Sequence, residues 1–199
     1  MYIGVTGQIG SGKTTAARIL GSFGAVVIDA DRIGREVVEK SPQLRRKLAK
    51  QFGKEILTAT GRLSRKKLAR LAFSDDVSKR RLNHLVHPML LKELRRQMRQ
   101  LSRRYDVVVI DAALLLDWNL DREMDLVLVI HATQETRLRR LVARGFSKED
   151  VLARQRAQLP FTEFRNRADL VILNNNTLLR LKARLRFVWD TFVAKSIDR

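Results

Sequence analysis

The sequence predicts an α/β fold in which helices cover both faces of a mainly parallel, five-stranded sheet. Five short runs rich in β-branched residues are apolar throughout, without the alternation of a sheet that has one face in water. Helical patterns separate the runs, and such alternation of strand and helix is typical of parallel sheets. Ligands of these sheets bind at the carboxyl ends of the strands. The predicted strands are residues 2–5, 25–28, 107–110, 126–130 and 170–173.

The composition indicates a folded protein with an unusual charge. The 199 residues include 40 Lys and Arg against 21 Asp and Glu, a formal net charge of +19, and 45% of them are hydrophobic, enough for a packed core. The absence of cysteine excludes a disulfide scaffold, a thiolate zinc site and a cysteine nucleophile. No apolar run approaches the ~20 residues of a membrane helix, and no secretory signal precedes the first strand. We therefore expect a soluble cytoplasmic protein without a membrane partner or an obligate protein partner.

Most of the excess charge lies in residues 41–104, which contain 19 basic and 4 acidic side chains, a net charge of +15. Such a charged face is usually a solvated helix surface, but charge this dense also makes nucleic acid a candidate partner. The 8 Phe, 2 Tyr and 2 Trp are scattered along the chain and do not interleave with the basic runs, as stacking on bases would require. Nucleic-acid binding is therefore the weaker alternative.

The same basic segment is predicted to be helical. Pro42 begins a pattern with an apolar residue every four positions, and Gly53 is a stop signal after it. Ser64 can cap the next helix, and after His87-Pro88 leucine and methionine recur at three- and four-residue spacing. Because a residue before proline disfavours helical backbone angles, a helix boundary or a core position is the simplest interpretation of His87.

The most specific motif is a phosphate-binding loop after the first strand. Residues 7–14, Gly-Gln-Ile-Gly-Ser-Gly-Lys-Thr, satisfy G-x-x-x-x-G-K-[ST] between a strand and a helix. Glycines let backbone N–H groups turn toward phosphate oxygens, and the helix N-terminus adds its dipole. We expect Lys13 to reach the β- and γ-phosphates of ATP and Thr14 to bind Mg²⁺. The motif predicts a three-layer P-loop NTPase fold whose nucleotide cradle also includes Gly10, Ser11, Gly12 and Thr15.

Carboxylates follow two further strands. Asp111 ends the strand at 107–110 in the Walker B arrangement, where it would support Mg²⁺ and its waters; a simple capping role is the alternative. Asp29 and Asp31 follow the second strand, and a kinase needs a carboxylate to position the acceptor hydroxyl and accept its proton. Asp31 lies further from the strand and is the better candidate, unless both cap the helix that begins near residue 33.

The class of P-loop protein can be narrowed from what the sequence lacks. It contains no Asn-Lys-x-Asp motif, with which GTPases read guanine, and it is too short for a large ATPase with added modules. A carboxylate pair after the second strand and a late arginine-rich segment instead favour a small-molecule kinase.

A collinear set of motifs resembles the dephospho-CoA kinase family over almost the whole chain. Residues 3–15 resemble the family's opening, residues 29–38 its second motif, and Asp111-Ala-Ala-Leu-Leu its Asp-x-Pro-Leu-Leu motif. Alanine replaces the proline of that last motif, and His131 stands where the family usually has aspartate. The other matches are Phe52-Gly53, Gly61-Arg62-Leu63, Arg65-Lys66-Lys67-Leu68, Leu85-Val86-His87-Pro88, Ala168-Asp169-Leu170-Val171-Ile172 and Asn174-Asn175.

The resemblance implies three parts and one reaction. Residues 1–34 and 105–199 would form the core that binds ATP, residues 35–104 a helical insertion that binds dephospho-CoA, and residues 140–168, approximately, a lid over the phosphates. The reaction would transfer the γ-phosphoryl group of ATP to the ribose 3′-hydroxyl of dephospho-CoA, the last step of coenzyme A biosynthesis.

The resemblance also implies roles for individual residues. Asp31 would be the base, and the acceptor site would be lined by Thr6, His87, Pro88, Leu114 and Leu115. Arg140 and Arg144 of the arginine-rich segment would stabilise charge on the phosphates, since guanidinium groups offer forked donors to phosphoryl oxygens. Asn175 would contact adenine, with a turn-forming role as the alternative. Two other functions remain as alternatives: a shikimate- or gluconate-type kinase, and a basic P-loop protein that binds nucleic acid.

Overall fold

The computed structural model describes residues 1–72 and 74–194. The chain divides into two compact units. We call Met1–Asp29 with Met98–Arg199 the sheet unit, and Ala30–Gln97 the helical unit. Within the described ranges, no helix combines the length and the apolar character that crossing a membrane requires.

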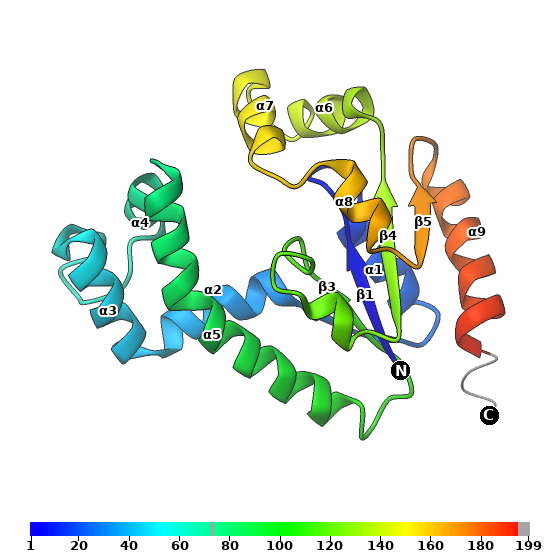
Figure 1. The fold of residues 1–199 in the computed structure, drawn as a ribbon, viewed down its shortest axis with the longest axis horizontal. Coiled ribbons are helices and arrows are strands. Elements are labelled where there is room, and N and C mark those ends of the chain that lie inside the picture. Colours follow the sequence, from blue (N-terminus) through cyan, green and yellow to red (C-terminus); the bar gives the residue numbers. More distant parts are fainter. Residues whose placement is uncertain (73, 195–199) are drawn as a thin grey trace. The chain divides into compact units, whose positions relative to one another are not determined.

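The sheet unit contains five parallel strands in the order β2-β3-β1-β4-β5, so β1 is central (Figure 1). All five predicted strands are confirmed. Because the strands are parallel, all their carboxyl ends lie at one edge of the sheet, the edge where ligands bind in folds of this kind. The strands are β1 (Tyr2–Thr6), β2 (Val26–Asp29), β3 (Val108–Asp111), β4 (Leu126–His131) and β5 (Leu170–Leu173).

Helices α1 and α9 form a core with the sheet. Leu20 of α1 and Leu185 of α9 are fully buried in one apolar cluster with Ile3, Val5 and Leu128 of the central strands. A buried leucine contributes about 1.5–3 kcal/mol to stability. The helices of the sheet unit are α1 (Lys13–Gly21), α6 (Gln134–Val142), α7 (Lys148–Arg156), α8 (Phe161–Asn166) and α9 (Leu178–Val188), with a 3₁₀ turn, η2 (Leu120–Glu123), and a π turn, η3 (Trp189–Val193).

The helical unit has its own apolar core. Leu44, Leu48, Ile56, Leu68 and Ala72 are buried together there. Its elements are α2 (Ala30–Lys40), α3 (Pro42–Phe52), the 3₁₀ turn η1 (Lys54–Ile56), α4 (Arg65–Ala72) and most of α5 (Asp76–Leu101).

The predicted helix that begins at Pro42 is confirmed, including its end. The Ser41 hydroxyl accepts a hydrogen bond from the Leu44 N–H at 3.1 Å and so caps the N-terminus of α3. The helix ends at Phe52, and Gly53 follows with a φ of 91°. Pro42 occupies the first turn, where its missing N–H costs no helical hydrogen bond.

The helix boundary expected at His87 is wrong. Pro88 lies inside α5, which runs without interruption from Asp76 to Leu101. The proline removes one backbone hydrogen bond of the helix, but the apolar side chains on both sides of it hold the helix in place. Leu85 packs against the core of the helical unit on one side, and Leu94 is fully buried on the other. Tertiary packing therefore overrides the local preference of the sequence.

Candidate active site

The phosphate-binding loop joins β1 to α1 at the carboxyl edge of the sheet. Gly12 precedes the first helical residue, Lys13, and has a φ of 98°. A Cβ at Gly12 would lie 2.3 Å from Nδ2 of Asn174, so only glycine fits there. The helix begins with the hydrogen bond from Ala16 N–H to Gly12 O, at 3.0 Å. Backbone N–H groups of the first turn have no acceptor within a helix, which makes this end of α1 suitable for a phosphate group.

Two side chains hold the loop from outside. The buried Asn174, which follows β5, donates from Nδ2 to Ser11 O at 2.7 Å. Arg140 of α6 donates from Nη1 to Ser11 O at 3.3 Å and to Gly10 O at 3.4 Å. The Nη2 of Arg140 also donates to Oδ1 of Asn174, at 3.5 Å. Segments that are more than 120 residues apart in the sequence therefore determine the shape of the loop.

The surroundings of Arg140 are strongly cationic. Burial lowers the pKa of Arg140, and the charges of Arg139 and Arg144 lower it further. A guanidinium group stays protonated despite such shifts, so these charges repel one another in the absence of an anion. An arrangement of this kind favours a polyphosphate at the loop.

A pocket of about 140 Å³ lies beside the loop. Four predicted nucleotide-binding residues come together in its wall: Gly12, Thr15, Arg140 and Arg144. Asn175 does not line this pocket; its Oδ1 instead accepts a hydrogen bond from Thr133 N–H at 2.8 Å. Its two neighbours line the pocket, Asn174 and Asn176. The structure therefore brings Asn174 and Asn176 to the pocket, and the contact of Asn175 with adenine stays a prediction.

Two carboxylates end neighbouring strands next to the loop. Asp29 of β2 and Asp111 of β3 are register partners, and Asp111 also pairs in register with Val5 of β1. Asp111 is buried and Thr14 is exposed in the first turn of α1. In the described part of the chain, no group of three His, Cys, Asp or Glu side chains could hold a metal ion. A hydroxyl and one carboxylate still fit Mg²⁺, which takes few protein ligands when phosphates and waters complete its shell.

The predicted acceptor residues of the sheet unit differ in accessibility. Thr6 is fully buried, and its hydroxyl finds no hydrogen-bond partner among the described residues. Leu115 is also fully buried and packs on β1, where a Cβ at Gly4 would lie 2.7 Å from its Cδ2. Leu114 is half-buried. The structure thus places Leu115 in the core, and Leu114 is the better placed of the two to contact a ligand.

The other predicted acceptor residues belong to the helical unit. Asp31 is exposed in the first turn of α2, two positions after the end of β2. A carboxylate at this end of a helix is stabilised by the helix dipole. His87 is half-buried and Pro88 exposed, both within α5.

A glutamine that sequence reasoning missed joins the segment after α7 to the phosphate-binding loop. The Ile9 N–H donates to Oε1 of Gln158 at 2.7 Å, and Nε2 of Gln8 donates to Leu159 O at 3.2 Å. Just beyond, the ring of Phe161 stacks on His131 at the end of β4, with a centroid distance of 3.8 Å. Because a glutamine near the end of a polar helix is unremarkable in composition, nothing in the sequence distinguishes Gln158 from its neighbours.

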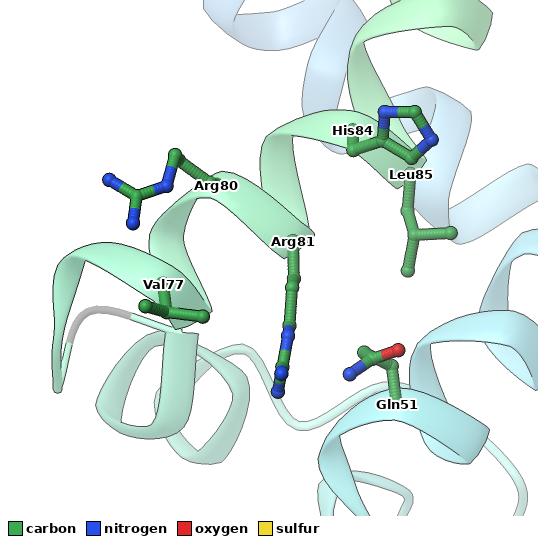
Figure 2. A pocket seen from close by; sticks show the side chains of 6 residues that line it. All are labelled: Gln51, Val77, Arg80, Arg81, His84 and Leu85. Atoms are coloured by element: carbon green, nitrogen blue, oxygen red, sulfur yellow. The ribbon is translucent and has the colours of Figure 1, made fainter.

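The helical unit contains a pocket of its own, with a volume of about 320 Å³ (Figure 2). Its walls come from α3 and the first half of α5: Gln51, Val77, Arg80, Arg81, His84 and Leu85. Figure 2 shows the Arg81 side chain extending toward α3, where Gln51 lies, whereas Arg80 points away. The sequence predicted the positive charge of this segment, but not that part of it surrounds a pocket.

Comparison with known proteins agrees with this geometry. The sequence profile of the dephospho-CoA kinase family matches residues 1–180. A dephospho-CoA kinase from Corynebacterium glutamicum is 43% identical over 190 residues, covering 94% of this chain and 97% of the relative. One from Thermobifida fusca is 40% identical over 191 residues, covering 96% of this chain and 95% of the relative.

Solved structures agree in fold. A Thermus thermophilus protein has a TM-score of 0.81 and 36% identity, covering 97% of this chain and 98% of the other. A dephospho-CoA kinase from Campylobacter jejuni has a TM-score of 0.75 at 24% identity, covering 98% of both chains. A shikimate kinase from Acinetobacter baumannii is more distant, with a TM-score of 0.54 at 15% identity and coverage of 98% and 93%. The last two likenesses concern the fold alone.

The family profile and the curated relatives therefore favour neither of the two alternative functions. The prediction of a P-loop kinase fold is confirmed, and ATP is the phosphoryl donor that a kinase of this family uses. The chain belongs to the dephospho-CoA kinase family.

Proposed function

We propose that this chain transfers the γ-phosphoryl group of ATP to the ribose 3′-hydroxyl of dephospho-CoA. The observation that carries the proposal is the phosphate-binding loop, held by Asn174 and Arg140, in a chain whose relatives are named dephospho-CoA kinases. We place the reaction in the cytoplasm, since the chain has no cysteine that would call for an oxidising compartment.

The nucleotide would bind along the carboxyl edge of the sheet. Its adenine would enter the pocket lined by Asn174 and Asn176, whose amides match the donors and acceptors of a purine edge. Its phosphates would lie on the loop, with Lys13 at the β- and γ-phosphates. Thr14 and Asp111 would hold Mg²⁺, which when bound neutralises part of the charge on the phosphate oxygens.

Asp31 would act as the base of the transfer. Its carboxylate would accept the proton of the 3′-hydroxyl while the oxygen attacks the γ-phosphorus and the bond to the β-γ bridging oxygen breaks, leaving ADP. Lys13 and Arg140 would stabilise the negative charge that spreads over the equatorial oxygens of the transferred group. Its place next to β2 and its exposure to solvent support this role for Asp31.

The pocket of the helical unit has the chemistry to bind part of the acceptor. Dephospho-CoA carries a diphosphate and an arm with two amides. Arg81 and His84 offer donors for the phosphate oxygens, Gln51 can pair with an amide, and Leu85 offers apolar contact. This assignment would give part of the positive charge in residues 41–104 a role in acceptor binding.

One assay tests the proposal. The purified chain with Mg²⁺ and ATP is offered dephospho-CoA, shikimate or gluconate, while ADP release is followed and the product mass is measured. Of the three acceptors, we expect only dephospho-CoA to give rapid turnover, and its mass should increase by that of one phosphoryl group. Lys13→Ala controls for contaminating kinases and should abolish turnover. Turnover with another acceptor, and none with dephospho-CoA, would refute the proposal.

A further inference from the structure

Arg137 of α6 is a buried cation, and two of its nitrogens have no hydrogen-bond partner among the described residues. Arg137 is only 7% exposed, and neither its Nε nor its Nη1 forms a hydrogen bond with any residue that the structure describes. Burial lowers its pKa, yet a guanidinium group does not give up its proton in proteins. Two donors of a charged group are therefore withdrawn from water with no acceptor among the described residues.

Such an arrangement is expensive unless a ligand completes it. An isolated buried charge costs several kcal/mol, and the penalty disappears only when the charge is paired and hydrogen-bonded. The missing partner is an anion with acceptor oxygens, because guanidinium offers only donors. The family reaction supplies such anions, the phosphoryl groups of the nucleotide.

Arg137 lies against the phosphate-binding loop. A Cβ at Gly10 would be 3.0 Å from the carbonyl oxygen of Arg137 and 3.2 Å from its Cα, so α6 packs directly on the loop at this point. Arg137 also lowers the pKa of His131, which places its charge within electrostatic range of the end of β4. The side chain is therefore near both the loop and the carboxyl edge of the sheet.

The position relative to Arg140 indicates which phosphate Arg137 would meet. Arg140 lines the pocket proposed for adenine, and Arg137, three residues earlier on the same helix, does not. Arg137 packs instead at Gly10, within the loop that cradles the β- and γ-phosphates. That is the opposite end of the nucleotide from its base, where the terminal phosphoryl group would lie.

A second unpartnered polar side chain supports a ligand near these helices. Gln155 of α7 has both its amide oxygen and its amide nitrogen buried without a hydrogen-bond partner among the described residues. Helices α6 and α7 contact one another. The polar atoms left over on this pair of helices are thus mostly donors, as an anionic ligand requires.

We propose that Arg137 is a phosphate-binding residue that donates from Nε and Nη1 to the terminal phosphoryl oxygens of bound ATP. This inference rests on the proposed use of ATP, and it adds a residue to the site.

The test measures nucleotide binding without acceptor and compares Arg137→Gln with the wild type. We expect the affinity for a non-hydrolysable ATP analogue, measured by calorimetry with Mg²⁺, to fall about 10-fold or more. The affinity for ADP should change less than about twofold. The unfolding temperature without ligand should rise or stay the same, because the variant removes an uncompensated buried charge.

Two further variants keep the test decisive. Arg137→Lys retains the charge and should recover part of the preference for the ATP analogue, and Arg122→Gln removes an exposed charge from η2, outside the nucleotide site, and should change neither affinity. Equal losses for both nucleotides, or a lower unfolding temperature with unchanged affinities, would overturn the proposal and indicate a structural role. Absence of nucleotide binding by the wild type would instead refute the proposed function.

Discussion

The side-chain amide of Asn174 donates a 2.7 Å hydrogen bond to the carbonyl oxygen of Ser11 and so joins the end of β5 to the phosphate-binding loop. Both residues are buried. The contact leaves Gly12 no room for a side chain, since a Cβ there would meet the same amide nitrogen. One asparagine therefore shapes the nucleotide site from a position that is more than 160 residues away in the sequence.

Asn174→Ala should raise the KM for ATP more than Asn175→Ala does. The first change leaves the Ser11 oxygen with only the longer hydrogen bond from Arg140, a loss of about 1 kcal/mol, and it also removes a wall of the adjacent pocket. Asn175 bonds only to Thr133 N–H in the described structure. Steady-state kinetics at saturating acceptor measures both constants. A larger effect at Asn175 would favour the contact with adenine that the sequence predicts.

Gln158→Ala should loosen the attachment of the segment after α7 to the phosphate-binding loop. The Ile9 N–H would lose the acceptor that it has at 2.7 Å, and a hydrogen bond of this kind contributes about 1 kcal/mol. Hydrogen exchange of the Ile9 amide should become about fivefold faster. Gln158→Glu keeps an acceptor oxygen at the same position and should retain the slow exchange. Equal acceleration in both variants would show that the bond does not protect the amide.

The stability of the sheet unit should fall as the pH drops below about 6.5. Burial, and then the charge of Arg137, lower the pKa of His131 in the folded state. The unfolded chain therefore binds a proton at a higher pH than the folded chain does, so protonation favours unfolding. Asp75 and Glu93 have pKa values of about 2 in the folded chain, so their protonation lowers the stability only at more acidic pH.

His131→Phe preserves an aromatic ring next to Phe161 and removes the titration. The difference in urea-unfolding free energy between pH 7 and pH 5 should be smaller in this variant than in the wild type. An unchanged difference would mean that His131 does not cause the acid sensitivity.

Arg167→Met should destabilise the segment after β3. Arg167 forms a salt bridge with Asp121 and donates to Leu116 O at 2.9 Å and to Asn119 Oδ1 at 3.0 Å. Loss of these partly buried, charged hydrogen bonds should lower the free energy of unfolding by about 2–3 kcal/mol, measured by urea denaturation. Arg165→Met, at an exposed position in the same stretch, is the matched control and should cost little. Equal effects would assign the loss to charge rather than to these contacts.

The elements that the sequence predicts best are those whose signals are local. The five strands follow from runs of β-branched residues, the loop from its glycines and lysine, and α3 from Pro42 and Gly53. α5 continues through Pro88 against the local signal because distant apolar side chains pack along it. Local patterns thus predict an element wherever tertiary packing does not oppose them.

The parts of the site that sequence reasoning missed depend on contacts between distant segments. Gln158 acquires its role only because the segment after α7 folds back on Ile9. Arg137 differs from the neighbouring arginines only in its burial. No signal in the sequence distinguishes the buried face of this helix from its exposed face. Asn174 and Asn175 are adjacent and identical, and only the direction of each side chain separates their contacts.

Arg81→Ser should raise the KM for dephospho-CoA while leaving the KM for ATP unchanged. Arg81 reaches toward α3 in the pocket of the helical unit, where we place the phosphates of the acceptor, and a hydrogen bond to a charged group is worth about 1.5–3 kcal/mol. The expected increase is therefore about 10-fold or more. Arg46→Ser makes the same change of charge at an exposed position of α3 outside this pocket and is the matched control. If both variants raise the KM equally, and high salt raises that of the wild type in the same way, the helical unit attracts the acceptor through its overall charge and the pocket binds nothing specific.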